Sequence, residues 1–145
     1  MELVIKKFEQ LTPREVYEIL KIRTAVFVVE QNCPYQEVDG TDYDSLHVWL
    51  EEKGEIKAYL RAFYVGEDGK TVQMGRVLSK ERGVGLGAKI VAAGIDAVKS
   101  AMKPEKIVIE AQTYALPFYE KFGFVTSGEE FLEDGIPHTP MTLMF

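Results

Sequence analysis

A glycine-rich segment from Arg82 to Ala88, with the sequence RGVGLGA, constrains this chain more than any other stretch. It follows an apolar run from Val72 to Leu78 that is typical of a strand, and it opens a helical pattern that extends from Gly85 to Ala101. The first N–H groups of a helix have no partner inside the helix, and the helix dipole places partial positive charge there. Glycines let a bulky group approach this backbone because they carry no Cβ atom. The segment is therefore a candidate phosphate site.

The composition indicates a single domain over residues 1–145, because 46% of the residues are hydrophobic and 28% are charged. A net charge of −6 argues against a nucleic-acid partner held by bulk electrostatics. The single cysteine, Cys33, excludes an intramolecular disulfide and is typical of a reducing compartment. The N-terminus is too charged for a signal peptide, and no apolar run approaches the roughly 20 residues of a membrane-spanning helix. We therefore expect a cytoplasmic protein with neither a membrane nor a nucleic-acid partner.

Hydrophobic periodicity and turn residues predict an α/β fold with the element order β–α–loop–βββ–α–β–α–ββ. The first helix starts at a capping box, in which Thr12 caps, Pro13 takes the first helical position and Glu15 closes the box. The apolar run from Lys106 to Glu110 predicts a central, parallel strand inside a mixed sheet. The predicted elements are a strand at 3–8, a helix from 13 to about 29, a loop at 31–45, strands at 46–51, 56–65 and 71–78, a helix at 85–101, a strand at 106–110, a short helix at 116–122, and strands at 124–132 and 139–145.

Three ligand-binding motifs compete for the glycine-rich segment. A P-loop, G-x-x-x-x-G-K-[ST], fits poorly, because Lys89 has no serine or threonine after it to hold magnesium. Gly83, Gly85 and Ala88 meet the dinucleotide-binding pattern G-x-G-x-x-G/A, and Glu110 follows about 20 residues further on. Two observations count against this pattern: four residues separate the preceding strand from Gly83, and the three strands before it are predicted to be antiparallel. The third pattern is R-x-x-G-x-G/A, which starts at Arg82.

This third pattern is part of a longer resemblance to the GNAT family of acyl-CoA-dependent N-acetyltransferases. The segment from Ala115 to Phe124 matches the family signature A-x-x-F-Y-x-x-x-G-F, and Gly75 to Leu78 end the strand along which the family binds the pantetheine arm. Within the family the chain resembles the ElaA-like subfamily at 26–35, 37–40, 44–47, 110–112 and 133–138. The resemblance implies the GNAT fold, a mixed, mostly antiparallel sheet of six to seven strands with a V-shaped splay between its central strands.

The resemblance also implies acetyl-CoA as the acyl donor, no metal, and direct transfer of an acetyl group to a primary amine of a small molecule or peptide. The amine is expected to enter over residues 31–44. The residues expected to bind CoA are Val77, Leu78, Arg82, Gly83, Val84, Gly85, Leu86, Gly87, Ala88, Gln112, Ala115, Phe118 and Tyr119. A rival hypothesis is a module that binds CoA or a nucleotide without catalysis. The sequence leaves open whether the protein is a monomer or a homodimer.

By resemblance, Tyr119 is the general acid that protonates the leaving CoA thiolate. A primary amine with a pKa of about 10.4 must also lose a proton at neutral pH. The residue that accepts this proton is not readable, because Gln73 occupies the strand position where several relatives carry a glutamate. The candidates for a base or an acceptor-site residue are Glu30, Asp39, His47, Glu110 and His138. Cys33 is expected to line the acceptor cleft rather than to act as a nucleophile.

Overall fold

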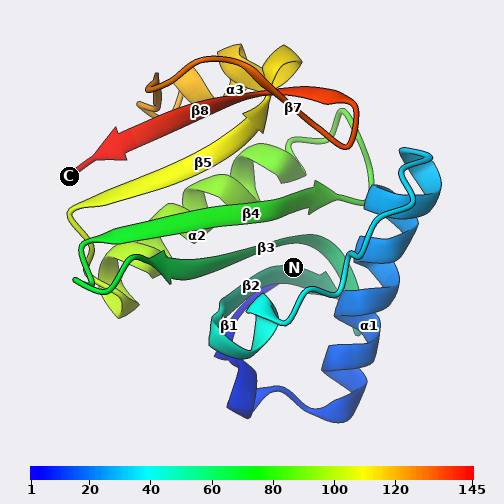
Figure 1. Cartoon of the computed structure of the whole chain (residues 1–145). Helices are drawn as coiled ribbons and strands as arrows, with labels where there is room; N and C mark the ends of the chain where they lie inside the picture. Colours follow the sequence, from blue (N-terminus) through cyan, green and yellow to red (C-terminus); the bar gives the residue numbers. More distant parts are fainter.

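The computed structural model describes every residue from Met1 to Phe145 and consists of one mixed sheet with helices on both faces (Figure 1). The strands lie in the order β1-β2-β3-β4-β5-β8-β6, and β7 pairs with β8, so the sheet has eight strands rather than the predicted six to seven. The strands are β1 (Glu2–Lys7), β2 (Leu46–Glu52), β3 (Glu55–Val65), β4 (Thr71–Ser79), β5 (Lys106–Gln112), β6 (Val125–Thr126), β7 (Phe131–Glu133) and β8 (Ile136–Met144). The helices are α1 (Pro13–Arg23), α2 (Leu86–Ala101) and α3 (Leu116–Glu120), with single turns η1 (Phe8–Gln10), η3 (Thr41–Asp44) and η4 (Thr113–Ala115) and a π-helical segment η2 (Thr24–Glu30).

Helix α1 begins at the predicted capping box. The Thr12 hydroxyl accepts a hydrogen bond from the N–H of Glu15 at 3.1 Å, and the Glu15 carboxylate accepts one from the N–H of Thr12 at 2.9 Å. The α-helical hydrogen bonding ends at Arg23, and the chain continues as the wider η2 up to Glu30. The helical pattern to about residue 29 is therefore present, but its last third has π-helical geometry, which is frequent near functional sites.

Helices α1 and α2 bury opposite faces of the sheet, and each face has its own apolar cluster. On the α2 face, Leu60 of β3 and Ile90 of α2 are fully buried. On the α1 face, Ile19 packs with Trp49 of β2 and Tyr59 of β3. Because both faces are covered, β2 is buried along almost its whole length, on the side of its apolar residues and on the opposite side alike.

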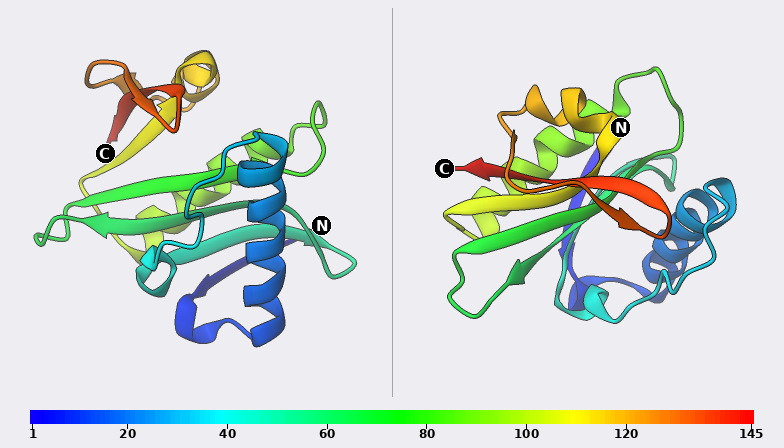
Figure 2. Two further views of the ribbon diagram at one scale, coloured as in Figure 1. Left: turned by 45° about the vertical axis from the view of Figure 1, so that its right-hand side comes forward. Right: turned by 45° about the horizontal axis from the view of Figure 1, so that its top comes forward.

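Strands β4 and β5 are neighbours for only part of their length. They pair in parallel where Thr71–Gln73 lies beside Lys106–Val108, and no pairing continues beyond these residues. Figure 1 shows the two strands diverging from this point, and the left view of Figure 2 shows β5 and β8 turned away from the rest of the sheet. The predicted splay between the central strands is thus confirmed. All other strand pairs are antiparallel, which rules out the doubly wound parallel sheet of a dinucleotide-binding fold.

The predicted strand at 124–132 is wrong in its middle. Only β6 and β7, at its two ends, pair with β8. Between them, Gly128 lies so close to Pro140 of β8 that an added Cβ atom would be 2.6 Å from the proline ring. Pro140 has no N–H group to donate to a neighbouring strand. The ladder therefore stops after the N–H of Ser127 has bonded to the Pro140 carbonyl at 2.9 Å.

Candidate active site

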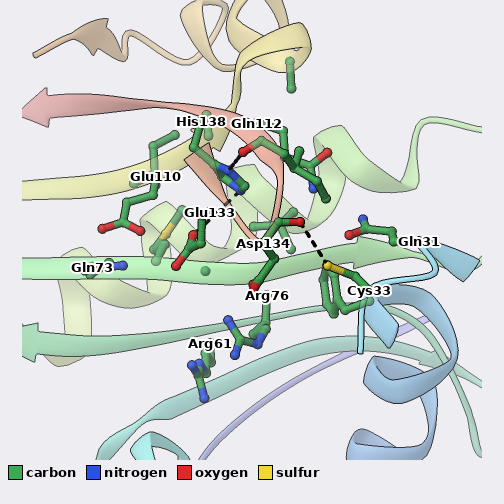
Figure 3. A pocket seen from close by; sticks show the side chains of 18 of the residues that line it. Gln31, Cys33, Arg61, Gln73, Arg76, Glu110, Gln112, Glu133, Asp134 and His138 are labelled. Atoms are coloured by element: carbon green, nitrogen blue, oxygen red, sulfur yellow. Dashed lines mark hydrogen bonds and ion pairs between the residues drawn. The ribbon is translucent and has the colours of Figure 1, made fainter. Parts of the chain in front are cut away.

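A cleft of about 470 Å³ opens where β4 and β5 separate. One wall is formed by β4 around Gly75, and the other by β5 from Ile109 to Gln112. The loop that follows η2 and the turn between β7 and β8 close the sides. Figure 3 shows Glu110, Gln112 and His138 on one side of this cleft, with Arg61 and Arg76 on the opposite side.

Tyr119 lines the cleft from α3. Its ring makes edge contacts with Phe118, at a centroid distance of 5.1 Å, and with Phe124, at 6.0 Å. Burial of the phenol, with a smaller contribution from Tyr114, raises the pKa of Tyr119 to about 12. The hydroxyl therefore keeps its proton at neutral pH and can donate it to a group in the cleft.

The other residues expected to bind CoA along the strands divide into two groups. Val77, Gln112 and Ala115 line the cleft together with Tyr119. Leu78 instead packs in the apolar cluster under α1, is only 4% exposed and does not line the cleft.

Phe118 packs against the first turn of α2 rather than lining the cleft. A Cβ atom at Gly87 would stand 3.7 Å from its ring, and the glycine therefore lets α3 approach α2 closely. Phe118 thus supports the position of Tyr119, its neighbour in the sequence, from behind.

The glycine-rich segment forms a loop that ends at the N-terminus of α2 and lies outside the cleft-lining residues. Gly83 and Gly85 have φ angles of +78° and +77°, and no heavy atom lies within 4 Å of the point where a Cβ atom would stand on either residue. The N–H groups from Leu86 to Ala88 have no backbone partner. Val84 is exposed, whereas Leu86 is buried and anchors the helix. An exposed backbone with free donors and no Cβ atoms fits a diphosphate.

Arg82 lies at the start of this loop, and its guanidinium is 3.6 Å from the carboxylate of Glu30 at the end of η2. Both side chains are more than half exposed, so the pair contributes little to stability. Glu30 does not line the cleft. Its proposed role as a base is therefore not supported by its position, which is beside the candidate phosphate loop.

The prediction that His47 belongs to the site is wrong. His47 is 1% exposed and is absent from the cleft lining. Its Nδ1 lies 2.6 Å from the Tyr59 hydroxyl, and its Nε2 lies 3.0 Å from the Asp42 carbonyl oxygen. Burial lowers the pKa of His47. It is a neutral, hydrogen-bonded core residue, because α1 and η3 cover the face of β2 from which it projects.

Glu110 and His138 are the two base candidates that the structure brings into the cleft with suitable chemistry. Burial, followed by the negative charge of Glu133, raises the pKa of the Glu110 carboxyl. His138 donates from Nδ1 to the carbonyl oxygen of Ile136 at 2.7 Å, which leaves Nε2 as the free ring nitrogen, 3.9 Å from the Glu133 carboxylate. The ring of His138 stacks on Phe131 at a centroid distance of 5.8 Å.

Asp39 and Cys33 also line the cleft, but their chemistry differs. Asp39 accepts two hydrogen bonds from Arg61, at 2.8 and 2.9 Å, which hold the pKa of its carboxyl well below the usual range and make it a poor proton acceptor. The Cys33 thiol contacts the carbonyl oxygen of Asp134 at 3.5 Å, and burial raises its pKa. A protonated thiol without a base is consistent with a wall residue.

Sequence reasoning missed an ion-pair network that fixes the loop after η2 to the sheet. Three arginines from α1, β3 and β4 meet three carboxylates from the loop, with N–O distances of 2.6 to 3.4 Å. The members are Arg23, Glu37, Asp39, Asp42, Arg61 and Arg76. The acidic loop is visible in the sequence, but its cationic partners lie on three separate elements, so a single sequence holds no signal that pairs them.

Comparison with known proteins identifies the family to which the chain belongs. A family model described as "Acetyltransferase (GNAT) domain" matches residues 9–145, so the chain belongs to the GNAT family of acetyltransferases.

Within that family its relatives include ElaA of Escherichia coli K12, which is 36% identical over 91% of this chain and 89% of that protein. The crystal structure of E. coli ElaA superposes with a TM-score of 0.91 at 34% identity and covers 97% of both chains. An acyl-CoA N-acyltransferase from Pseudomonas aeruginosa gives a TM-score of 0.90 at 38% identity, over 98% of this chain and 99% of that one. None of the helices is long and apolar enough to cross a membrane, and no group of three or more His, Cys, Asp or Glu side chains could hold a metal ion.

Proposed function

We propose that the protein is an acetyl-CoA-dependent N-acetyltransferase whose acceptor is a primary amine on a small molecule or peptide. The observation that carries this proposal is the splay of β4 and β5, which opens a cleft with a protonated tyrosine, Tyr119, in its wall. The family membership supports acyl transfer, and the glycine-rich loop near the cleft supports a donor that carries a diphosphate.

The chain offers a continuous binding path for acetyl-CoA. The free N–H groups from Leu86 to Ala88, with Arg82, would hold the pyrophosphate. The separated edges of β4 and β5 would pair with the amides of the pantetheine arm, as an added strand pairs with an open sheet. The bound co-substrate would supply an activated thioester at the level of Val77 and Leu78, where a backbone N–H can polarise the thioester carbonyl.

The remaining cleft residues would accept and donate the protons of the reaction. Glu110 or His138 accepts the proton that the acceptor ammonium has to lose, directly or through water. The amine nitrogen forms the new C–N bond as the C–S bond breaks, without a covalent enzyme intermediate. The high pKa of Tyr119 keeps its hydroxyl protonated at neutral pH, so the hydroxyl can hydrogen-bond the departing sulfur. As Tyr119 passes its proton to the thiolate, it regains one from the second proton that the acylated nitrogen loses, and the products are the amide and the free CoA thiol.

The substitution Tyr119→Phe tests this assignment in an assay of thiol release from acetyl-CoA with a panel of amines and peptides. We expect kcat to fall roughly 100-fold, the ordinary contribution of a positioned acid, with little change in the KM for acetyl-CoA. Tyr17→Phe is the matched control, because Tyr17 is an exposed residue of α1, far from the cleft lining. Tight CoA binding with no turnover on any acceptor would instead identify a binding module.

A further inference from the structure

The strand that would carry the thioester contains a bulge at Arg76. Tyr59 of β3 lies opposite Leu78, but Arg61 lies opposite Gly75, so β4 has one residue more than β3 in this stretch. Arg76 has a φ angle of +53°. This left-handed conformation is unfavourable for a residue with a Cβ atom, and it persists only where the surroundings hold it. A bulge changes the direction of the backbone groups that follow it, here those of Val77 and Leu78.

The side chain of Arg76 is held by Glu37 from the loop after η2. The Nε of Arg76 lies 2.8 Å from Oε1 and 2.9 Å from Oε2 of Glu37, and one of its terminal nitrogens lies 3.4 Å from Asp39. The guanidinium also lies 5.9 Å from the centre of the Tyr35 ring. Glu37 therefore contacts the one residue of the strand whose backbone is strained.

Glu37 is anchored on its other side as well. Its carboxylate accepts from Arg23 of α1, with distances of 2.6 and 2.7 Å to the two guanidinium nitrogens, and from the hydroxyl of Tyr35 at 3.0 Å. Glu37 is 4% exposed and Arg23 is not exposed at all. One buried carboxylate thus connects α1, the loop that borders the cleft and the bulge of β4.

We propose that Glu37 is a positioning residue for acyl transfer. Because Glu37 binds both Arg23 and Arg76, it keeps the β4 bulge in the geometry that directs the backbone N–H of Val77 toward the thioester carbonyl, while the N–H of Leu78 faces Tyr59 of β3. The inference rests on the proposed function for its catalytic consequence. Glu37 acts through the backbone conformation of Arg76 and does not touch the reacting atoms.

The variants Arg76→Ala and Arg76→Gly test this directly, because both remove the same ion pair and differ in the cost of a positive φ angle. We expect Arg76→Ala to lower kcat roughly tenfold, equivalent to about 1.4 kcal/mol, with the KM for acetyl-CoA nearly unchanged. Arg76→Gly should recover most of that loss, since glycine adopts a positive φ without strain. Equal kcat values in the two variants would overturn the proposal.

The variant Glu37→Gln provides a second test of the proposal. It should lower kcat by a similar factor in the wild-type background, but it should cause little further loss when combined with Arg76→Gly. A full loss in the Arg76→Gly background would mean that Glu37 acts by another route and would overturn the proposal. Glu67→Gln, at the exposed turn between β3 and β4, is the matched control. If Glu37→Gln fails to fold because Arg23 is left unpaired, the Arg76 pair of variants decides the question alone.

The amide resonances of residues 75–78 in labelled protein separate this inference from the proposed function. They should shift in Glu37→Gln and Arg76→Ala and return toward wild-type positions in Arg76→Gly. If wild-type protein acetylates no amine, the proposed function fails, while these resonances still decide whether Glu37 fixes the bulge. Unchanged resonances in Glu37→Gln would show that it does not.

Discussion

Two carboxylates of the cleft, Asp39 and Glu110, differ in how readily they accept a proton. Arginines hold the pKa of Asp39, and that of the buried Asp42 outside the cleft lining, below the ordinary value, through hydrogen bonds and charge that outweigh burial. Glu110 has no such partner, so burial and Glu133 raise its pKa. A base needs a pKa closer to neutral than that of a free carboxylate, which makes Glu110 better placed than Asp39.

Glu110→Gln should lower kcat/KM roughly 100-fold, the scale of a lost general base. In the wild type, kcat/KM should rise with pH through a pKa above the ordinary glutamate value, because the carboxyl must first lose its own proton. This rise should be absent in the variant, in a pH profile measured with one fixed amine. Glu105→Gln, an exposed residue just before β5, should behave as wild type. If His138→Gln abolishes the rise and Glu110→Gln does not, His138 is the base.

Protonation of the ion-pair network should destabilise the protein in acid. Asp39 and Asp42 have folded-state pKa values below the unfolded value of 3.8, so their contribution is present above that pH and is lost as the pH falls through and below it. The free energy of unfolding in urea should therefore change little between pH 7 and pH 5 and should decrease as the pH falls from about 4 toward 2. Asp42→Asn should cost about 3 kcal/mol at pH 7, because Arg23 is left short of a buried partner, and should weaken this pH dependence. Asp96→Asn, on the exposed face of α2, should change neither quantity.

Among the elements, the glycine-rich loop before α2 gives the most direct prediction for ligand binding. Gly85→Ala should raise the KM for acetyl-CoA roughly fivefold to tenfold, a loss of about 1 to 1.4 kcal/mol in binding, because the added methyl group stands where the diphosphate approaches. It should also cost about 1 kcal/mol of stability through its positive φ angle.

Gly69→Ala is the control for that backbone cost. Gly69, in the turn between β3 and β4, has a φ angle of +70° and equally open space around it. The variant should lose similar stability in thermal or urea unfolding but keep the wild-type KM. Equal KM values for the two variants would contradict a phosphate site at the glycine-rich loop.

The elements that could be predicted from the sequence are those whose structure depends on residues close together in the chain. The capping box of Thr12 and Glu15 fixes the start of α1 from residues three apart, and the apolar run of β5 marks a strand, although only one of its two sides is buried. The division of 124–132 depends instead on Pro140, a residue of the opposing strand that the local pattern does not contain. The π-helical geometry of η2 likewise has no signature in the periodicity that predicts a helix there.

At the scale of the whole molecule, the two parts of the sheet meet over only a few residues of β4 and β5, and the splay beyond them opens the cleft proposed as the active site. The glycine-rich loop and Tyr119 could be named as candidate site residues from motifs, because each motif is continuous in the sequence. The burial of His47 could not be predicted, since it depends on α1 and η3 covering its face of β2. The role of Glu37 could not either, because its two arginines lie 14 and 39 positions away.

Mass spectrometry of amine and peptide acceptors, after incubation with acetyl-CoA and the purified protein, tests the proposed N-acetyltransferase activity directly. We expect an acceptor that gains one acetyl group on nitrogen, with an equal amount of free CoA released, and a much slower reaction with Tyr119→Phe. Acetyl-CoA that binds in the cleft but is transferred to no acceptor, or a product formed equally fast by Tyr119→Phe, would contradict the proposed activity.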